Sequence, residues 1–241
     1  AAGDVITTAE RLIGSDFADT LGGSANGDTI EGGLGADNIS GGAGDDILSG
    51  GADNDTLIGG AGADQIDGGT GYDIATYAAS LAAVTVYLDG TTGSGGDAAG
   101  DVLSNIEELI GSGFDDRLYG ANAAETIRGG AGLDIITGGG GDDQLYGDAG
   151  NDTITGGAGA DLIDGGAGTD TASYATSLLG VTVYLDGTAS VGGDADGDTL
   201  VSIETLIGSS LADTVYGSAN ADRVESGIGD DIMFSSAGAD V

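Results

Sequence analysis

A nine-residue repeat dominates the sequence and limits what the chain can fold into. Counted from Gly14, it runs unbroken through seven nonapeptides, and further blocks begin at Gly111 and Gly208. A typical copy is GGLGADNIS at 32–40, in which we expect a six-residue turn followed by a three-residue strand. Glycines accept positive φ angles, so such a turn can curl tightly. The repeat therefore predicts a solenoid of short strands and not a hairpin sheet.

Position eight of the nonapeptide is apolar in almost every copy, as in Ile30, Ile39 and Leu48. One inward residue between two outward ones is the alternation of a β-strand. We expect two nonapeptides to make one coil, with parallel strands about 4.8 Å apart on each face. Outward positions seven and nine include Ile47, Ile58, Ile74, Tyr119, Tyr146 and Tyr216.

A longer period of 97 residues is superimposed on the short one, because TVYLDGT at 85–91 returns at 182–188. It predicts a division into the end of a connector (1–13), a first block (14–76), a connector (77–110), a second block (111–173), a connector (174–207) and a truncated third block (208–241). Since the chain begins and stops within units, we expect it to be a segment of a longer repetitive polymer.

The connectors contain VTVYL at 84–88 and 181–185, which predicts interspersed β-strands. Their tyrosines are expected to pack against the solenoid, with a sugar-stacking surface as the alternative; these are Tyr77, Tyr87, Tyr174 and Tyr184. Gly-Asp pairs in the connectors resemble stretched cation-binding turns, and the sequence leaves open whether they add cation sites. Their carboxylates are Asp97, Asp101, Asp194 and Asp198. We expect Glu10, Glu107 and Glu204 to be solvated.

The formal net charge is −37, from 41 acidic residues and only four Arg. Such a charge repels itself and destabilises a compact state, so a neutralising divalent cation is expected. It also makes nucleic acid and anionic membranes improbable partners. We find no apolar run that could span a bilayer, so membrane insertion is not expected, and residues 1–15 lack the features of a signal peptide.

Position six carries a carboxylate in a fixed phase, which ordinary turn preference does not explain. With loop carbonyls it would form an oxygen cage suited to Ca²⁺; Mg²⁺ prefers strict octahedra, and the His or Cys that zinc needs are absent. Pairing repeats n and n+2 gives about twelve ions. Glu125 is the exception; the predicted metal ligands are Asp19, Asp28, Asp37, Asp46, Asp55, Asp64, Asp73, Asp116, Asp134, Asp143, Asp152, Asp161, Asp170, Asp213, Asp222, Asp231 and Asp240.

Residues such as 41–46 (GGAGDD), 59–64, 129–134 and 156–161 fit GGxGxDxUx, which resembles the RTX, or hemolysin-type, calcium-binding repeat. The connectors are similar to spacers of long proteobacterial RTX proteins. The resemblance implies an all-β fold, a right-handed parallel β-roll with calcium ions between its turns. It further implies export by type I secretion and an extracellular or cell-surface location.

Catalysis is not expected, since the chain has no His, Cys or Lys for a nucleophile–base pair or a P-loop. The first functional hypothesis is a structural segment that folds on Ca²⁺ binding after secretion, in an adhesin stalk, a fibre or a surface layer. The alternative is the folding and secretion module of a secreted enzyme or toxin. Ice binding is disfavoured, because position seven mixes residue types. Self-association and a cell-surface ligand remain open partners.

Overall fold

The computed structural model describes residues 11–236 and 238. Apart from two 3-10 turns, its regular elements are all β-strands, and every pairing between strands described below is parallel. This confirms the prediction of a parallel β-solenoid. The chain divides into two compact units, Ala1–Leu118 and Tyr119–Val241.

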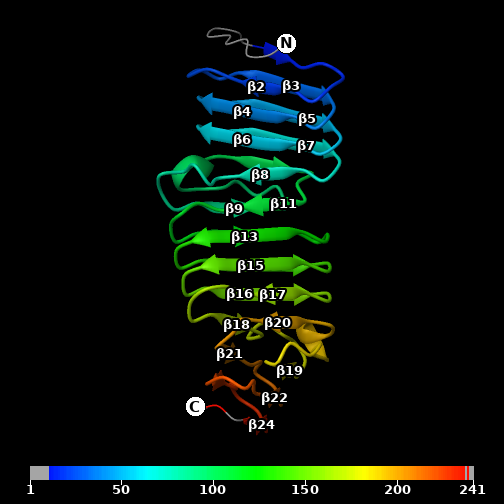
Figure 1. The fold of residues 1–241 in the computed structure, drawn as a ribbon, viewed down its shortest axis with the longest axis vertical. Coiled ribbons are helices and arrows are strands. Elements are labelled where there is room, and N and C mark those ends of the chain that lie inside the picture. Colours follow the sequence, from blue (N-terminus) through cyan, green and yellow to red (C-terminus); the bar gives the residue numbers. More distant parts are fainter. Residues whose placement is uncertain (1–10, 237, 239–241) are drawn as a thin grey trace. The chain divides into compact units, whose positions relative to one another are not determined.

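The first unit builds two sheets from alternate nonapeptides. Strands β1, β3, β5, β7 and β10 form one sheet and β2, β4, β6, β8 and β11 lie in the other; in Figure 1, β2, β4 and β6 lie one below another. The bounds are β1 Arg11–Ile13, β2 Thr20–Gly22, β3 Thr29–Leu34, β4 Asn38–Ala43, β5 Ile47–Ala52, β6 Thr56–Ala61, β7 Gln65–Thr70, β8 Ile74–Thr76, β9 Thr85–Tyr87, η1 Gly96–Ala98, β10 Val102–Ser104, β11 Glu108–Ile110 and β12 Arg117–Tyr119.

The second unit repeats this arrangement. Its strands are ordered β13-β15-β17-β20, β14-β16-β18-β21-β23 and β19-β22-β24. The bounds are β13 Thr126–Ala131, β14 Ile135–Gly140, β15 Gln144–Ala149, β16 Thr153–Ala158, β17 Leu162–Asp164, β18 Thr171–Ser173, β19 Thr182–Tyr184, η2 Gly193–Ala195, β20 Thr199–Val201, β21 Thr205–Ile207, β22 Thr214–Tyr216, β23 Arg223–Glu225 and β24 Ile232–Phe234.

The register confirms two nonapeptides per coil. Ile30 pairs with Leu48 and Leu48 pairs with Ile66, so each strand lies beside the strand two repeats later. Ile39 pairs with Leu57 in the same way on the other sheet. The roll therefore places every position of repeat n directly beside the same position of repeat n+2.

Position eight forms the core, as the alternation predicts. Ile30, Ile39, Leu57 and Ile127 are fully buried, in one row behind each sheet. The last row is an exception, since Met233 is 50% exposed although the pattern places it inside. It lies in β24, and no later described strand covers it.

Most strands of the repeat blocks are longer than predicted. Strand β3 spans six residues and includes Gly32, Gly33 and Leu34, which the repeat pattern assigns to the following turn. The reason is that Gly33 and Leu34 continue the parallel register, opposite Gly51 and Ala52. Other strands stop after three residues, among them β2, ahead of a turn with Ser24 at position two, and β17.

The connectors continue the roll. The predicted strands appear as β9 and β19, while β10 pairs with β7 and β11 with β8. In the second unit β20 pairs with β17 and β21 with β18. Tyr77 and Tyr174 are buried, as the packing interpretation expects. Tyr184 is half-buried and stacks on Tyr216, with their ring centroids 4.6 Å apart.

Candidate calcium sites

The position-six carboxylates form hydrogen-bonded ladders along the turns. In the first unit the backbone N–H of Asp19 donates to Oδ1 of Asp37 at 2.8 Å, and that of Asp37 donates to Oδ1 of Asp55 at the same distance. On the alternate repeats, the backbone N–H of Asp28 donates to Oδ1 of Asp46 at 2.7 Å, and that of Asp46 donates to Oδ1 of Asp64 at 2.8 Å. Each carboxylate therefore connects its own turn to the turn one coil earlier.

The second unit has the same ladders. The N–H of Asp143 donates to Asp161 at 2.9 Å, and that of Asp152 donates to Asp170 at 2.8 Å. Glu125, the exception in the pattern, keeps its place, because its N–H donates to Oδ1 of Asp143 at 2.9 Å. The position-six residues that these hydrogen bonds join are thus brought together as pairs two repeats apart, whereas Oδ1 of Asp116 accepts from the connector N–H of Val84. Asp240 lies outside the described residues.

Two connector residues per unit also belong to the ladders. Asp64 donates its N–H to Oδ1 of Asp101 at 2.9 Å, and Asp73 donates its N–H to Oε2 of Glu107 at 2.8 Å. In the second unit Asp198 and Glu204 accept from Asp161 and Asp170, both at 2.9 Å. The expectation of solvated Glu107 and Glu204 is therefore wrong: both are half-buried and replace an Asp where the connector interrupts the nine-residue phase.

The second oxygen of many of these carboxylates has no hydrogen-bond donor. The atom is buried, and the side chains that carry it are at most 3% exposed. These Oδ2 atoms belong to Asp37, Asp46, Asp55, Asp64, Asp73, Asp143, Asp152, Asp161 and Asp170. Buried polar groups are almost always paired, and an unpaired buried charge is far more costly than a neutral group. A row of such oxygens thus calls for a cation.

The surroundings of these oxygens fit a calcium ion. A Cβ placed on Gly32 would contact both Oδ2 of Asp37 and the carbonyl oxygen of Gly50. The same holds for Gly41, between Asp46 and the carbonyl of Gly59. Carboxylate and carbonyl oxygens therefore converge at these turns, and these are the hard ligands that Ca²⁺ prefers.

Backbone oxygens would have to complete each site. Among the described residues, no three His, Cys, Asp or Glu side chains come together as a metal-binding group. Asp37 with the Gly50 carbonyl, and Asp46 with the Gly59 carbonyl, would be part of the ligand sets of two such ions. This agrees with the predicted combination of carboxylates and loop carbonyls, while the assignment of individual ligands stays a prediction.

Burial alters the proton affinity of the ladder. Desolvation raises the pKa of Asp64 and Asp143 to about 7 and that of Asp55 to about 6, although a backbone N–H to each carboxylate partly opposes this. Asp19 differs, because the N–H and hydroxyl of Ser15 hold its pKa below the usual value. Without cations, the deepest carboxylates would thus retain protons near neutral pH.

The model of the RTX calcium-binding nonapeptide repeat matches residues 7–39, 40–75, 104–136, 119–154, 137–172 and 207–241. These matches span well over half of the chain. The chain belongs to the RTX calcium-binding nonapeptide repeat family. A search of curated proteins finds no match.

Membership of the RTX family identifies calcium as the ion that these turns are built for. RTX repeats of the GGxGxDxUx form account for the glycine-lined turns and for the fixed acidic position. No helix in the part of the chain that the structure describes combines the length and apolar character of a membrane span.

Proposed function

We propose that this RTX chain is a structural segment of an extracellular protein that folds when it meets calcium after export by type I secretion. The observation that carries the proposal is the row of buried Oδ2 atoms without donors, such as those of Asp46, Asp55 and Asp152. An ion-free roll must bury these charges or protonate them, and either costs free energy. Calcium binding would remove that cost, so binding and folding become one event.

Calcium concentrations support a role for this coupling in export. Extracellular calcium modules bind with dissociation constants of about 10⁻⁴–10⁻³ M, far above cytosolic calcium. The chain would therefore be unfolded in the cytosol and fold outside. The net charge of −37 acts in the same direction, because self-repulsion expands the ion-free chain.

A structural role is supported by the strict repetition of the connectors. Tyr77 donates its hydroxyl to Asp101 at 2.9 Å, and Tyr174 donates to Asp198 at 2.8 Å, 97 residues later. The 3-10 turns η1 and η2 recur at the same spacing. Repetition of a complete 97-residue unit, side-chain contacts included, is expected of a stalk, a fibre or a layer that gains length by adding units.

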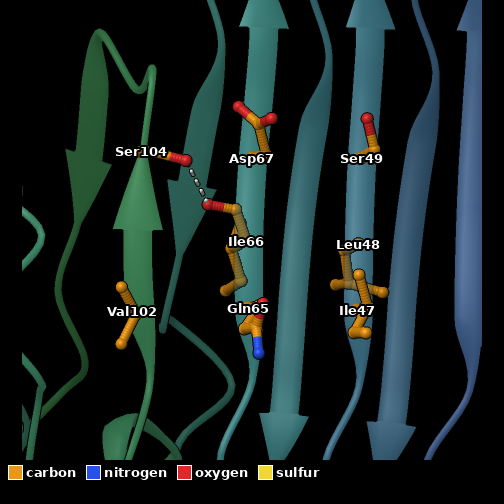
Figure 2. A pocket seen from close by; sticks show the side chains of 8 residues that line it. All are labelled: Ile47, Leu48, Ser49, Gln65, Ile66, Asp67, Val102 and Ser104. Atoms are coloured by element: carbon orange, nitrogen blue, oxygen red, sulfur yellow. Dashed lines mark hydrogen bonds between the residues drawn. The ribbon is translucent and has the colours of Figure 1, made fainter.

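A hollow among the described residues of the first unit gives no support for catalysis. A shallow hollow of about 360 Å³ opens on β5, β7 and β10, with Ile47, Gln65, Asp67 and Val102 among its lining (Figure 2). Its one carboxylate, Asp67, accepts a hydrogen bond from Asn105 at 2.7 Å, and no second titratable side chain lines the hollow. General acid–base catalysis needs such a partner. We therefore propose that the chain is not an enzyme.

Small-angle X-ray scattering during a calcium titration tests the proposal. The chain starts in chelator and is titrated to about 10 mM Ca²⁺, a range that includes extracellular affinities. We expect Ca²⁺ to lower the radius of gyration. The same concentration of Mg²⁺, the matched control, should lower it several-fold less. A chain that is equally compact in chelator would contradict folding by calcium.

The forward scattering in the same titration separates the structural roles. If it rises after the collapse, the chains associate, as a fibre or surface layer requires. If it stays constant, the roll is monomeric, as a passive stalk or the secretion module of an enzyme or toxin would be. A catalytic domain elsewhere in the same polypeptide would favour the module.

A further inference from the structure

Most turns of the roll are of two kinds, and the residue at position two distinguishes them; the turn at 120–125, with Ala121 and Glu125, belongs to neither. In one kind position two is Ser with an ordinary negative φ, and the turn hydrogen-bonds its own position-six carboxylate. The N–H of Ser24 donates to Oδ2 of Asp28 at 2.6 Å. The N–H and hydroxyl of Ser15 donate to Oδ2 of Asp19 at 2.6 and 2.8 Å. We call these serine turns.

In the other serine turns the N–H and the hydroxyl of Ser reach both carboxylate oxygens. In the turn at 208–213, the N–H and hydroxyl of Ser209 donate to Oδ2 and Oδ1 of Asp213 at 2.8 and 2.7 Å. Ser218 makes the same pair of bonds to Asp222, at 2.6 and 2.8 Å. A local side-chain and backbone cap of this type is a common Ser motif.

In the second kind of turn, position two has a positive φ and gives no such cap. Gly42, Gly51 and Gly60 have φ angles of 108°, 114° and 96°. The Oδ2 atoms of the same turns, on Asp46, Asp55 and Asp64, are the buried oxygens without donors. We call these open turns. The positive φ at position two, and not the glycine side chain, makes a turn open. Asp148 also has a positive φ, of 66°, and the Oδ2 of Asp152 in its turn likewise has no hydrogen-bond donor.

We propose that calcium occupies only the open turns, and that in the serine turns the N–H and hydroxyl of position two take the place of the ion. This rests on the proposed function, since it assumes that the roll binds calcium. Serine turns lie at the start of each repeat block, at 14–19, 23–28, 111–116, 208–213 and 217–222. The five open turns of the first block follow at 32–37, 41–46, 50–55, 59–64 and 68–73.

The connectors add to the part of each 97-residue repeat that holds its carboxylates without ions. Oδ1 of Asp101 accepts from the N–H of Asp64 at 2.9 Å, and its Oδ2 accepts from the hydroxyl of Tyr77 at the same distance. Asp198 is satisfied in the same way by Asp161 and Tyr174, at 2.9 and 2.8 Å. Both carboxylates are fully engaged by the protein and are left out of the calcium sites. Each 97-residue unit thus joins an ion-binding segment to a segment that holds its carboxylates without ions.

Converting one serine turn into an open turn tests the inference by a gain of binding. The variant Ser24→Gly/Asn26→Gly gives residues 23–28 the glycine positions of residues 41–46, the turn stacked on it through Asp28 and Asp46. We expect native mass spectrometry of the full chain at saturating calcium to show one more ion than wild type. Asn38→Gly/Ser40→Gly, in strand β4, is the control with the same change of composition and should gain none.

A loss-of-binding pair covers the case in which the glycine variant fails to fold. Asn keeps an acceptor oxygen but loses the charge. Asp46→Asn, in an open turn, should lose at least one ion, whereas Asp28→Asn, in a serine turn, should bind as many ions as wild type.

The outcomes separate the two proposals. A wild-type chain that binds no calcium refutes the proposed function itself. A wild type that binds calcium, but loses an ion in Asp28→Asn, overturns the inference alone. So does a folded Ser24→Gly/Asn26→Gly variant with the wild-type number of ions.

Discussion

At the scale of single residues, the fold depends on backbone conformations that only glycine adopts without strain. Gly51 has a φ of 114°, and a Cβ there would press into the carbonyl group of Gly33 on the neighbouring turn. Substituting Ala should cost about 1–2 kcal/mol for the left-handed conformation and more for the contact. Calcium-saturated Gly51→Ala should therefore unfold at a lower urea concentration than wild type.

Gly22 is the control for that substitution. It lies in β2 without a positive φ, and a Cβ there would meet nothing within 4 Å. Gly22→Ala should leave the midpoint unchanged or raise it slightly. Equal losses in the two variants would mean that the turns do not hold the conformations described. Free calcium must be the same in every sample, because bound ions add to the measured stability.

The hydroxyl of Tyr77 is a second residue whose loss has a defined effect. It is the donor to Oδ2 of Asp101, and both residues are buried. Tyr77→Phe leaves a buried charged acceptor without a partner, which should destabilise the first unit by about 1–3 kcal/mol. Urea unfolding in saturating calcium measures it. Tyr146→Phe is the control, because it removes a hydroxyl whose hydrogen bond to Gln144 is exposed. A loss of stability as large as in Tyr77→Phe would contradict the role of the buried Tyr77 hydroxyl.

At the scale of elements, regular repetition is what made the strands predictable. Ile30, Leu48 and Ile66 follow at 18-residue intervals, so one correct phase places every coil. The connectors break that phase: Asp101 lies 37 residues after Asp64, and Glu107 lies 34 after Asp73. Neither interval is a multiple of nine, so counting along the chain could not place these carboxylates in the ladders.

The difference between serine and open turns is present in the sequence at position two, outside the position-six pattern. Ser15 and Ser24 occupy position two, where Gly33 and Gly42 stand in later repeats. A pattern that fixes only position six treats these turns alike. What the pattern cannot express is that a residue with negative φ directs its own N–H at the carboxylate.

An aromatic stack on the last three described strands of one sheet provides an element-scale prediction. Tyr216 of β22 lies between Tyr184 and Phe234, with ring centroids 4.6 and 4.7 Å apart. Aromatic pairs contribute about 0.5–1.5 kcal/mol each beyond their buried area. Tyr216→Ala should therefore lower amide protection in β19, β22 and β24 by hydrogen exchange, at saturating calcium. Leu178→Ala, at an 87% exposed position of the same unit, is the control and should leave this amide protection unchanged. An equal loss of protection in the two variants would contradict a stabilising role of the stack.

At the scale of the whole molecule, charge and burial oppose each other. The apolar core has one row of side chains behind each sheet, as in Ile39 and Leu57, while the net charge is −37. Protons and calcium ions can each relieve this conflict at the same carboxylates. The stability of the roll should therefore depend on pH in opposite ways with and without calcium.

Without calcium, acid should favour the roll. An unfolded Asp has a pKa of about 3.9, whereas burial raises that of Asp55 to about 6 and those of Asp64 and Asp143 to about 7. Between these values the folded state binds more protons, so its stability is greatest below about pH 4 and is lost as the pH rises to 7. In chelator, circular dichroism should show more β-structure at pH 4.5 than at pH 7.5.

With calcium the dependence should reverse, because each ion must displace the protons that these carboxylates hold. The calcium concentration at half-folding should rise as the pH falls from 7.5 to 5.5, and adding calcium to a weakly buffered chain at pH 6.5 should release protons. Calcium midpoints that do not change with pH, together with no proton release, would show that the ions bind elsewhere than at the buried ladder. A fall in midpoint towards low pH would contradict the sign of the raised pKa values. Ionic strength is kept constant throughout, because salt alone screens the repulsion among the remaining charges.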